Sequence, residues 1–244
     1  MNGPWDNLSR MIYPGRLLAI GRDRSDAHHV ILYAITGRSP SSQARRLERE
    51  GNGVWTKPTD PETLKKGNPE LLVYPAILFS RGIAISNGRQ TADIDPQRGP
   101  RAVSVLAEAL GGWSFEPDAP IFTPRISGCV CPAGSAALSI IKRGRDGRAR
   151  RSYHEIDAGP GRGALISTYA GDNREPLAAF EGEPLEIKFD EATPEATAEA
   201  AFAALRPAGR AEDFRVALAC VFARRSNPNE FRLVIVNRWE RTGA

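Results

Sequence analysis

Short apolar runs, rich in β-branched residues and bounded by Gly, Pro, Asn or Asp, recur along the whole chain. Runs of this length and composition are typical of β-strands. The segments that we expect to be strands are 16–20, 30–35, 71–79, 83–86, 136–142, 164–169, 214–222 and 231–236. Many of them follow one another with only a turn between them, so the pattern predicts sheets built largely from hairpins.

Three segments read as helices instead, namely 42–50, 100–110 and 193–205. The first follows serine caps, the second has apolar residues at helical spacing before two glycines, and the third begins at Thr193 and Pro194. These helices lie between clusters of strands and do not alternate strictly with them. The pattern therefore favours a layered α+β fold, and we expect residues 1–244 to form a single domain, since an apolar content of 41% is enough for one core.

Charge and cysteine content exclude some classes of protein. A formal net charge of +4 is a mild bias, which suits phosphorylated small molecules as much as nucleic acid. Three cysteines argue against a disulfide framework, and the first thirty residues lack the pattern of a signal peptide. No apolar run approaches the roughly 18 residues that a spanning helix needs. We expect a cytoplasmic protein with no membrane or nucleic-acid partner.

Two conspicuous motifs have ordinary structural explanations. The basic segment "KRGRDGRARR" at 142–151 contains Asp146 and Gly147, a strong hairpin-turn signal, and it lacks aromatic residues on which bases would stack. The segment "GPGRG" at 159–163 lacks the Lys-Ser/Thr of a P-loop and reads as a turn before a strand. Neither motif by itself predicts a ligand site.

The sequence offers no metal site and no familiar hydrolase nucleophile. Cys129, Cys131 and His154 lack the C-x-x-C spacing of structural zinc sites, so we expect small buried thiols and no metal. There is no Gly-x-Ser-x-Gly motif, and no Ser, Thr or Cys follows the first methionine. Cleavage before Cys129 would expose a nucleophile with an activating amine, which leaves an amide hydrolase as a remote alternative.

Several polar stretches follow or precede predicted strands: "YPGR" at 13–16, "TGRS" at 36–39, "NGRQT" at 87–91, "FEPDAP" at 115–120, "TPRISG" at 123–128 and "ISTY" at 166–169. Loops held by a rigid scaffold can converge on one pocket, although each stretch taken singly is also a plausible turn. In this order the stretches resemble the archaeal-type inosine monophosphate (IMP) cyclohydrolase family. The resemblance runs from Tyr13 to about Phe180.

The resemblance implies a four-layer αββα sandwich like that of N-terminal nucleophile hydrolases, without their self-processing nucleophile. It also implies an activity: 5-formamidoimidazole-4-carboxamide ribotide (FAICAR) closes its ring to IMP and releases water. Because both reacting groups lie on one molecule, the enzyme needs to hold them together and to move protons. The implied partner is thus a purine ribotide (FAICAR, IMP or the aminoimidazole ribotide AICAR), with no cofactor.

By the same resemblance, Tyr74 and Glu116 match the catalytic tyrosine and glutamate of the family. Tyr74 would polarise the formyl oxygen, and Glu116 would relay the proton that leaves the nitrogen. Without the resemblance they read as a strand tyrosine with its hydroxyl at the surface and as a solvated loop carboxylate. Arg38 and Arg125 are the cations expected near the phosphate or the reacting carbonyl, and Arg16 is either a third such cation or part of a surface ion pair.

The remaining expected contacts come from hydrogen-bonding groups in the same stretches. The segment at 87–91 would form one wall of the nucleotide pocket and hold the carboxamide, ribose or phosphate. The residues expected to bind substrate, besides the arginines, are Ser39, Asn87, Gly88, Gln90, Thr91, Thr168 and Tyr169. None of them is a nucleophile or a metal ligand in this interpretation.

One position departs from the family pattern. The family places a catalytic arginine five residues beyond Arg38, and this chain has Gln43 there, with Arg45 two residues later. A small adjustment of the loop would let Arg45 take the role. The alternative is a catalytically impaired homologue that still binds purine ribotides, since losing a cationic donor is not a conservative change. The sequence leaves the oligomeric state open, a homo-oligomer included.

Overall fold

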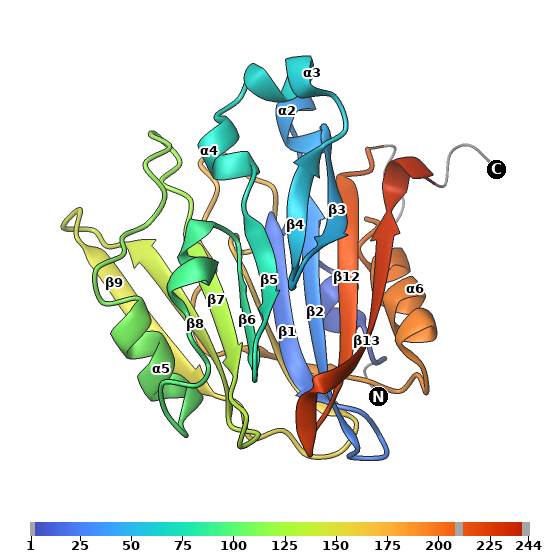
Figure 1. The fold of residues 1–244 in the computed structure, drawn as a ribbon. Coiled ribbons are helices and arrows are strands. Elements are labelled where there is room, and N and C mark those ends of the chain that lie inside the picture. Colours follow the sequence, from blue (N-terminus) through green and yellow to red (C-terminus); the bar gives the residue numbers. More distant parts are fainter. Residues whose placement is uncertain (1–2, 208–211, 241–244) are drawn as a thin grey trace.

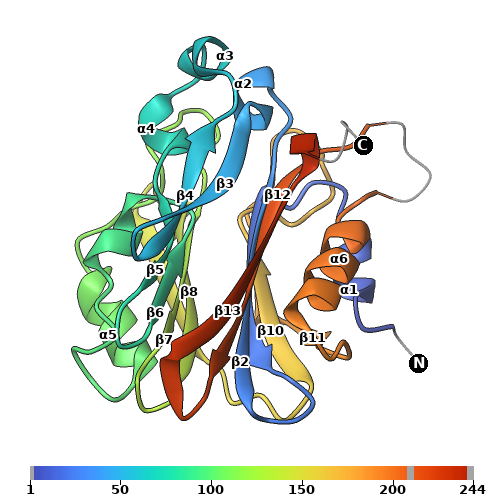
Figure 2. The same cartoon turned by 45° about the vertical axis from the view of Figure 1, so that its right-hand side comes forward.

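Two antiparallel sheets face each other in a computed structural model that describes residues 3–207 and 212–240 (Figures 1 and 2). Within these residues, one sheet has six strands in the order β11 (Leu185–Lys188), β10 (Arg162–Ser167), β1 (Arg16–Arg22), β2 (His28–Thr36), β12 (Arg215–Arg224) and β13 (Asn227–Asn237). The other has seven in the order β3 (Arg45–Glu50), β4 (Gly53–Pro58), β5 (Pro75–Phe79), β6 (Ile83–Ser86), β7 (Arg125–Val130), β8 (Ala136–Arg143) and β9 (Ala149–Glu155). The α+β prediction is confirmed.

Helices lie on the outer faces of the sheets. In Figure 2, α6 (Pro194–Ala204) and α1 (Asp6–Ser9) cover the six-stranded sheet, and α5 (Ala102–Ala109) lies on the outer side of the other sheet. The short helices are α2 (Pro40–Gln43), α3 (Pro61–Lys65), α4 (Pro69–Leu72) and the 3-10 turns η1 (Arg89–Asp93) and η2 (Arg238–Glu240). None of the helices in the described residues is long and apolar enough to cross a membrane.

The apolar runs are nearly continuous because the central strands are buried on both faces. Leu18 and Ile20 of β1 point into the core between the sheets, whereas Leu17 and Ala19 pack under α6. Successive side chains of a strand point to opposite faces, so both sets must be apolar here. Thr193 caps α6 by accepting a hydrogen bond from the backbone nitrogen of Ala196, as predicted.

The predicted helix at 42–50 is wrong. Ser39 does cap a helix, but α2 lasts a single turn, and strand β3 begins at Arg45. The buried residues of β3 alternate, with Arg45 and Leu47 inside and Arg46 exposed, which is the two-residue period of a strand. Arg46, Glu48 and Glu50 share the outward face of this strand, where Arg46 pairs with Glu48 at 2.7 Å.

Other differences concern the bounds and the number of strands. The run at 71–79 is a strand only from Pro75, because Pro69 opens the one-turn helix α4 before it. β4, β7, β9 and β11 were not predicted as strands, since their apolar content is low or interrupted. The turn predicted at Asp146 and Gly147 does join β8 to β9, and Gly147 has the positive φ of 78° that such a turn requires.

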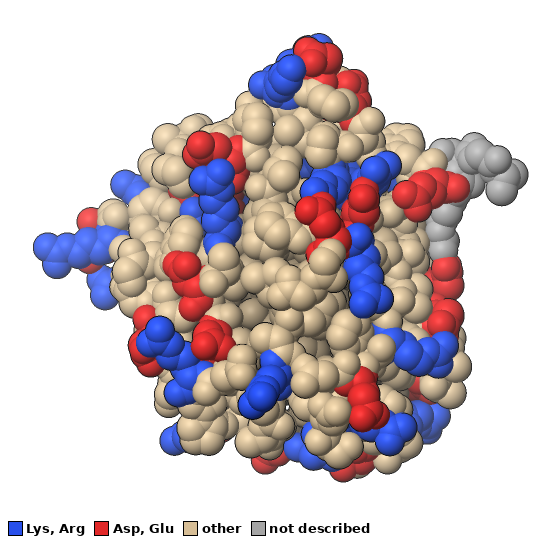
Figure 3. Space-filling model, viewed as in Figure 1, with Lys and Arg blue, Asp and Glu red and all other residues tan. Residues whose placement is uncertain are grey.

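The surface carries charge of both signs on the face shown in Figure 3, where Lys and Arg are interspersed with Asp and Glu. Basic side chains project at the left edge of that view, where Figure 1 draws the tip of the β8–β9 hairpin. No continuous basic stripe crosses this face of the molecule. A stripe of that kind is the usual footprint of a nucleic-acid binder.

Candidate active site

A cavity of about 270 Å³ lies where several strands begin or end at one edge of the two sheets. Arg16 is the first residue of β1, Tyr74 directly precedes β5, Asn87 follows β6 and Arg125 is the first residue of β7. The predicted site residues that line the cavity itself are Arg16, Arg38, Ser39, Glu116 and Tyr169. Segments separated by more than a hundred residues therefore meet at one place.

The centre of this site is a buried ion pair between Arg16 and Glu116. Nη2 of Arg16 donates to both carboxylate oxygens of Glu116, at 2.8 and 3.0 Å. Only 2% of the Glu116 surface is exposed, and Arg16 is also buried. Glu116 is thus no solvated loop carboxylate, and the expected surface ion pair of Arg16 is in fact a buried one. A buried pair of this kind is costly to break, since the remaining charge is left uncompensated.

Burial and charge act on Glu116 in opposite directions. Burial raises the pKa of the carboxyl, and the guanidinium groups of Arg16 and Arg125 offset only part of that rise. For Arg16, burial lowers the pKa, but the Glu116 carboxylate and the nearby tyrosines together outweigh it and the net pKa is raised. Arg16 stays charged. The pKa of Glu116 lies closer to neutral pH than that of an ordinary glutamate, so Glu116 is better suited to exchange a proton.

The amide side chains after β6 hold this pair in place. Asn87 donates to Glu116 at 3.3 Å and accepts from the backbone nitrogen of Ile126 and from Gln90. Gln90 in turn accepts from Nη1 of Arg125 at 2.9 Å. Asn87 and Gln90 are fully buried and lie behind the cavity, so their hydrogen bonds orient Glu116 and Arg125.

Gly88 and Thr91 complete this support. A Cβ atom at Gly88 would lie 2.6 Å from Nη1 of Arg125, which explains why the position between the two amides is a glycine. The hydroxyl of Thr91 donates to the carbonyl of Gly88 and contacts Ser86. The segment expected to form a wall of the pocket is therefore a rigid base for the residues that do line it.

Tyr74 is buried, and its hydroxyl meets a second tyrosine. The hydroxyl oxygens of Tyr74 and Tyr33 are 2.7 Å apart, and only 1% of Tyr74 is exposed, which excludes a surface tyrosine. Burial and the neighbouring Tyr74 raise the pKa of Tyr33 well above its usual value, although Arg16 and Arg45 lower it in part. Tyr33 therefore keeps its proton. The two hydroxyls form a chain in which one proton is free for a further acceptor.

Gln43 and Arg45 have very different surroundings. Nε2 of Gln43 donates to the carbonyl of Gly37, and the residue lies outside the cavity beside Trp239. Arg45 is 1% exposed, and its Nε donates to the carbonyl of Ser42. Both terminal nitrogens of Arg45 are buried without a hydrogen-bond partner in the described residues. An unpaired buried guanidinium is costly unless a ligand or water completes it.

The remaining predicted residues shape the entrance. Arg38 pairs with Glu175 at 2.6 Å and lies over the ring of Tyr13 at 4.9 Å. Ser39 caps α2 at the rim. Thr168 joins the start of β1 to the end of β10, because its hydroxyl donates to Pro14 and accepts from the Arg16 backbone.

The loop between α5 and β7 aims Glu116 at the cavity. Asp118 accepts from the backbone nitrogen and hydroxyl of Thr123, and the Glu116 nitrogen donates to the Thr123 carbonyl. The Thr123 hydroxyl is 2.8 Å from that of Tyr169. Asp118, Thr123 and Tyr33 were not among the predicted site residues. Asp118 and Thr123 lie inside the motifs that carried the resemblance, so a signal for them was present. Tyr33 lies in an apolar run, and no neighbouring residue indicates that its hydroxyl has a role in the site.

The cysteines and possible metal ligands lie elsewhere. Cys129 is fully buried under α5, and the hydrogen bond that it shares with Cys131, together with burial, raises its pKa far above the usual range. This thiol is a poor nucleophile in the intact chain. No cluster of three His, Cys, Asp or Glu side chains within residues 3–207 and 212–240 has the arrangement of a metal site.

Two comparisons with known proteins bear on these residues. Residues 13–227 match a family model described as IMP cyclohydrolase-like protein. The matched range includes every side chain of the site described above. A comparison with curated proteins gave no significant match.

Proposed function

This chain belongs to the IMP cyclohydrolase-like protein family, and we propose that it closes the ring of FAICAR to give IMP and water. One observation carries the proposal: a buried Arg16–Glu116 pair lines one small cavity, and a buried Tyr33–Tyr74 hydroxyl pair lies close enough to Arg16 to raise its pKa. Ring closure within one molecule needs a rigid site with a proton acceptor and hydrogen-bond donors, and these residues supply both.

The first step is an addition. The carboxamide nitrogen attacks the formyl carbon, a nitrogen–carbon bond forms, and negative charge develops on the formyl oxygen. In our scheme Glu116 accepts the proton that leaves the nitrogen, and the Tyr74 hydroxyl donates to the oxygen. Removing one such donor typically costs an enzyme about 3 kcal/mol of transition-state stabilisation.

The second step is the loss of water. The carbon–oxygen bond breaks, the former formamido nitrogen gives its proton to the departing oxygen, and a carbon–nitrogen double bond completes the purine ring. Glu116 returns its proton to the departing hydroxyl, so the carboxylate is regenerated. The net change is FAICAR to IMP and water, which needs no redox partner.

Two supporting residues enter this scheme from the structure. Tyr33 fixes the direction of the Tyr74 hydroxyl, because the two oxygens are 2.7 Å apart. Arg45 supplies the cation that the family pattern places at Gln43, and its free terminal nitrogens are the donors that a developing oxyanion requires. The Gln43 amide instead donates to the Gly37 carbonyl, and the residue lies outside the cavity, which supports Arg45 for this role.

The layering supports the finer part of the fold proposal. Helices on the outer faces of two opposed sheets agree with an αββα sandwich of the N-terminal nucleophile hydrolase type. In this proposal the chain forms one domain. The protein acts on its ribotide in the cytoplasm. The chain carries Cys129 inside β7. An amide hydrolase that uses Cys129 would have to break a central strand, so this alternative loses its support.

The test is a direct assay. Purified protein and FAICAR should develop the ultraviolet absorbance of IMP at a rate proportional to enzyme concentration, and Tyr74→Phe should lower that rate. Tyr153→Phe on β9, a half-buried tyrosine that does not line the cavity, is the matched control. Calorimetric binding of IMP without turnover would instead favour the impaired ribotide-binding homologue, and a rate equal to that of buffer would refute the activity.

A further inference from the structure

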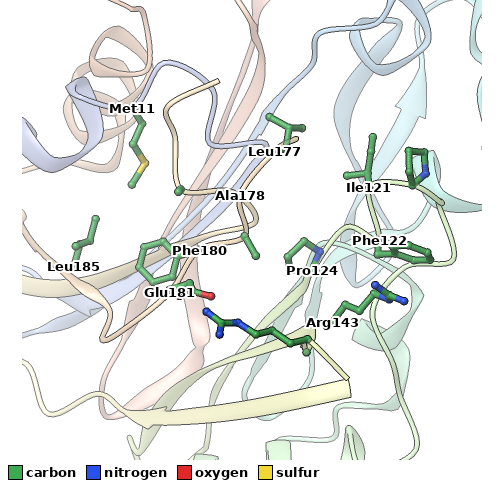
Figure 4. A pocket seen from close by; sticks show the side chains of 15 residues that line it. Met11, Ile121, Phe122, Pro124, Arg143, Leu177, Ala178, Phe180, Glu181 and Leu185 are labelled. Carbon is green, nitrogen blue, oxygen red and sulfur yellow. The ribbon is translucent and has the colours of Figure 1, made fainter. Parts of the chain in front are cut away.

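A second cavity, larger than the first, adjoins the candidate active site. It has a volume of about 710 Å³ and lies between the loop at 120–124, the β8–β9 turn and the segment 177–181 (Figure 4). Its walls are apolar at Met11, Phe180 and Leu185 and basic at Arg143 and Arg145. The basic hairpin that sequence analysis explained as a solvated turn thus contributes to a cavity.

Positive charge predominates in this cavity. Neither Arg143 nor Arg145 lies within 4 Å of a carboxylate in the described residues, whereas the nearby Lys142 pairs with Glu181 at 2.8 Å. Glu181 is the one acidic residue among the lining side chains of the described chain, and it is already paired. The two arginines are therefore available to an anion.

Arg143 is held in position. Its guanidinium lies over the ring of Phe122 at 4.5 Å from the centroid, and Figure 4 shows both side chains on the same wall. Phe122 has a φ of 50°, a conformation that bulky residues rarely adopt. The Asp118 carbonyl, which accepts from the Phe122 nitrogen at 3.2 Å, holds this conformation. Strain of this kind is typically retained at functional sites.

The two cavities are neighbours. Ile121 and Leu177 line both of them, and one loop carries Glu116 into the smaller cavity and Phe122 into the larger. The smaller cavity, at about 270 Å³, is below the roughly 300–1,000 Å³ typical of ligand pockets. A ribotide whose reacting arms lie beside Glu116 thus needs further space for its other end.

The arginines of the smaller cavity are already engaged. Arg16 pairs with Glu116, and Arg38 pairs with Glu175. Arg125, behind the cavity, donates to Gln90 and to the Ser114 carbonyl. A phosphate at any of these would have to share the guanidinium with the acceptor that it already holds. At Arg143 and Arg145 it would displace only solvent.

We propose that the larger cavity holds the phosphomonoester end of the ribotide, with Arg143 and Arg145 as the phosphate ligands and Ile121 and Leu177 between the phosphate and the reacting base. This inference rests on the proposed function. It assigns the phosphate to the β8–β9 hairpin and not to the arginines next to Glu116. A guanidinium suits phosphate because its planar donors can bind two oxygens at once.

The experiment compares IMP with inosine, which lacks the phosphate, by calorimetry at low salt. The double variant Arg143→Gln/Arg145→Gln should bind IMP at least about tenfold more weakly and inosine unchanged, since it loses two charged hydrogen-bond donors. The matched control is Arg148→Gln/Arg150→Gln, which removes the same charge from the same hairpin but outside the cavity. The control should bind both ligands like the wild type.

Each outcome decides a different claim. If the double variant and the control bind IMP equally, or if only Arg38→Gln reduces the preference for IMP over inosine, the phosphate lies elsewhere and the inference is overturned while the proposed function stands. If the wild-type protein neither binds IMP nor converts FAICAR, the proposed function fails and the inference fails with it. Circular dichroism of each variant verifies that the hairpin changes leave the fold intact.

Discussion

The two adjoining cavities differ in whether their charged side chains are buried and paired. In the smaller one, Arg16 and Glu116 are buried and neutralise each other, and the hydroxyls of Tyr33 and Tyr74, close to Arg16, are hydrogen-bonded to each other. In the larger one, Arg143 and Arg145 are exposed and have no carboxylate within 4 Å in the described residues. Fixed, mutually oriented groups suit chemistry, whereas solvated cations suit the capture of an anion. The difference suggests a division between reaction and recognition.

The largest effect should come from breaking the buried pair. Arg16→Met leaves the Glu116 carboxylate buried without a counter-ion, which typically costs about 3–5 kcal/mol of folding free energy. Arg143→Met, at the open cavity, should change stability by less than about 0.5 kcal/mol. Urea denaturation followed by circular dichroism measures both. Equal losses for the two variants would contradict the distinction between the cavities.

Removing the proton acceptor should come next. Glu116→Gln should lower kcat by about 10²–10⁴, the usual contribution of general acid–base catalysis. Because burial raises the pKa of Glu116, the wild-type rate should rise with pH through an acid limb above about 4.3, the ordinary glutamate value, as the carboxyl loses its proton. The variant should lack this limb in its profile of kcat/KM against pH. If the acid limb remained in the Glu116→Gln variant, a group other than Glu116 would be responsible for it.

Arg45→Met should separate stability from activity. Its terminal nitrogens are buried without partners, so an apolar side chain of similar length should leave the Tm equal or higher. The same change should lower kcat by about a hundredfold if Arg45 stabilises the developing oxyanion. Calorimetric unfolding and the FAICAR assay measure the two effects. A large fall in Tm would show that Arg45 has a structural role instead, and Gln43→Ala, outside the cavity, is the control.

The smallest effect in the buried cluster should be that of Tyr33→Phe. The variant removes one hydroxyl and keeps the ring, so Tyr74 stays in place but its hydroxyl loses a partner at 2.7 Å. We expect kcat to fall about tenfold with KM unchanged, since a neutral hydrogen bond contributes roughly 0.5–1.5 kcal/mol. A change in KM alone would mean that Tyr33 acts on binding.

The sequence predicted the long, buried strands of the fold better than the strands at the sheet edges. Strands buried on both faces, such as β2 and β12, were predicted because their apolar runs are long and uninterrupted. The error at 42–50 arose where charge is dense, since a strand with one solvated face can carry as many charged residues as a helix. β9 was missed for the same reason, because most of its residues are polar and half-exposed or exposed.

The site could be predicted in part. Motifs next to strand ends marked Arg16, Glu116 and Arg38, which line one cavity. The sequence could not separate lining residues from supporting ones: Asn87 and Gln90 look like ligand-binding amides but face inward. The partner of a hydrogen bond is chosen by the packing of distant segments, which no local pattern records.

By itself, the sequence determined the strand-rich α+β architecture, the turns at glycines and the order of motifs that identifies the family. Those properties follow from side-chain size, polarity and backbone freedom, which act over a few residues. Only the tertiary structure decided that Arg16 meets Glu116, that Tyr33 meets Tyr74 and that Arg45 is left unpaired. These contacts join residues far apart in the chain, and they exist because two sheets bury their facing sides against each other.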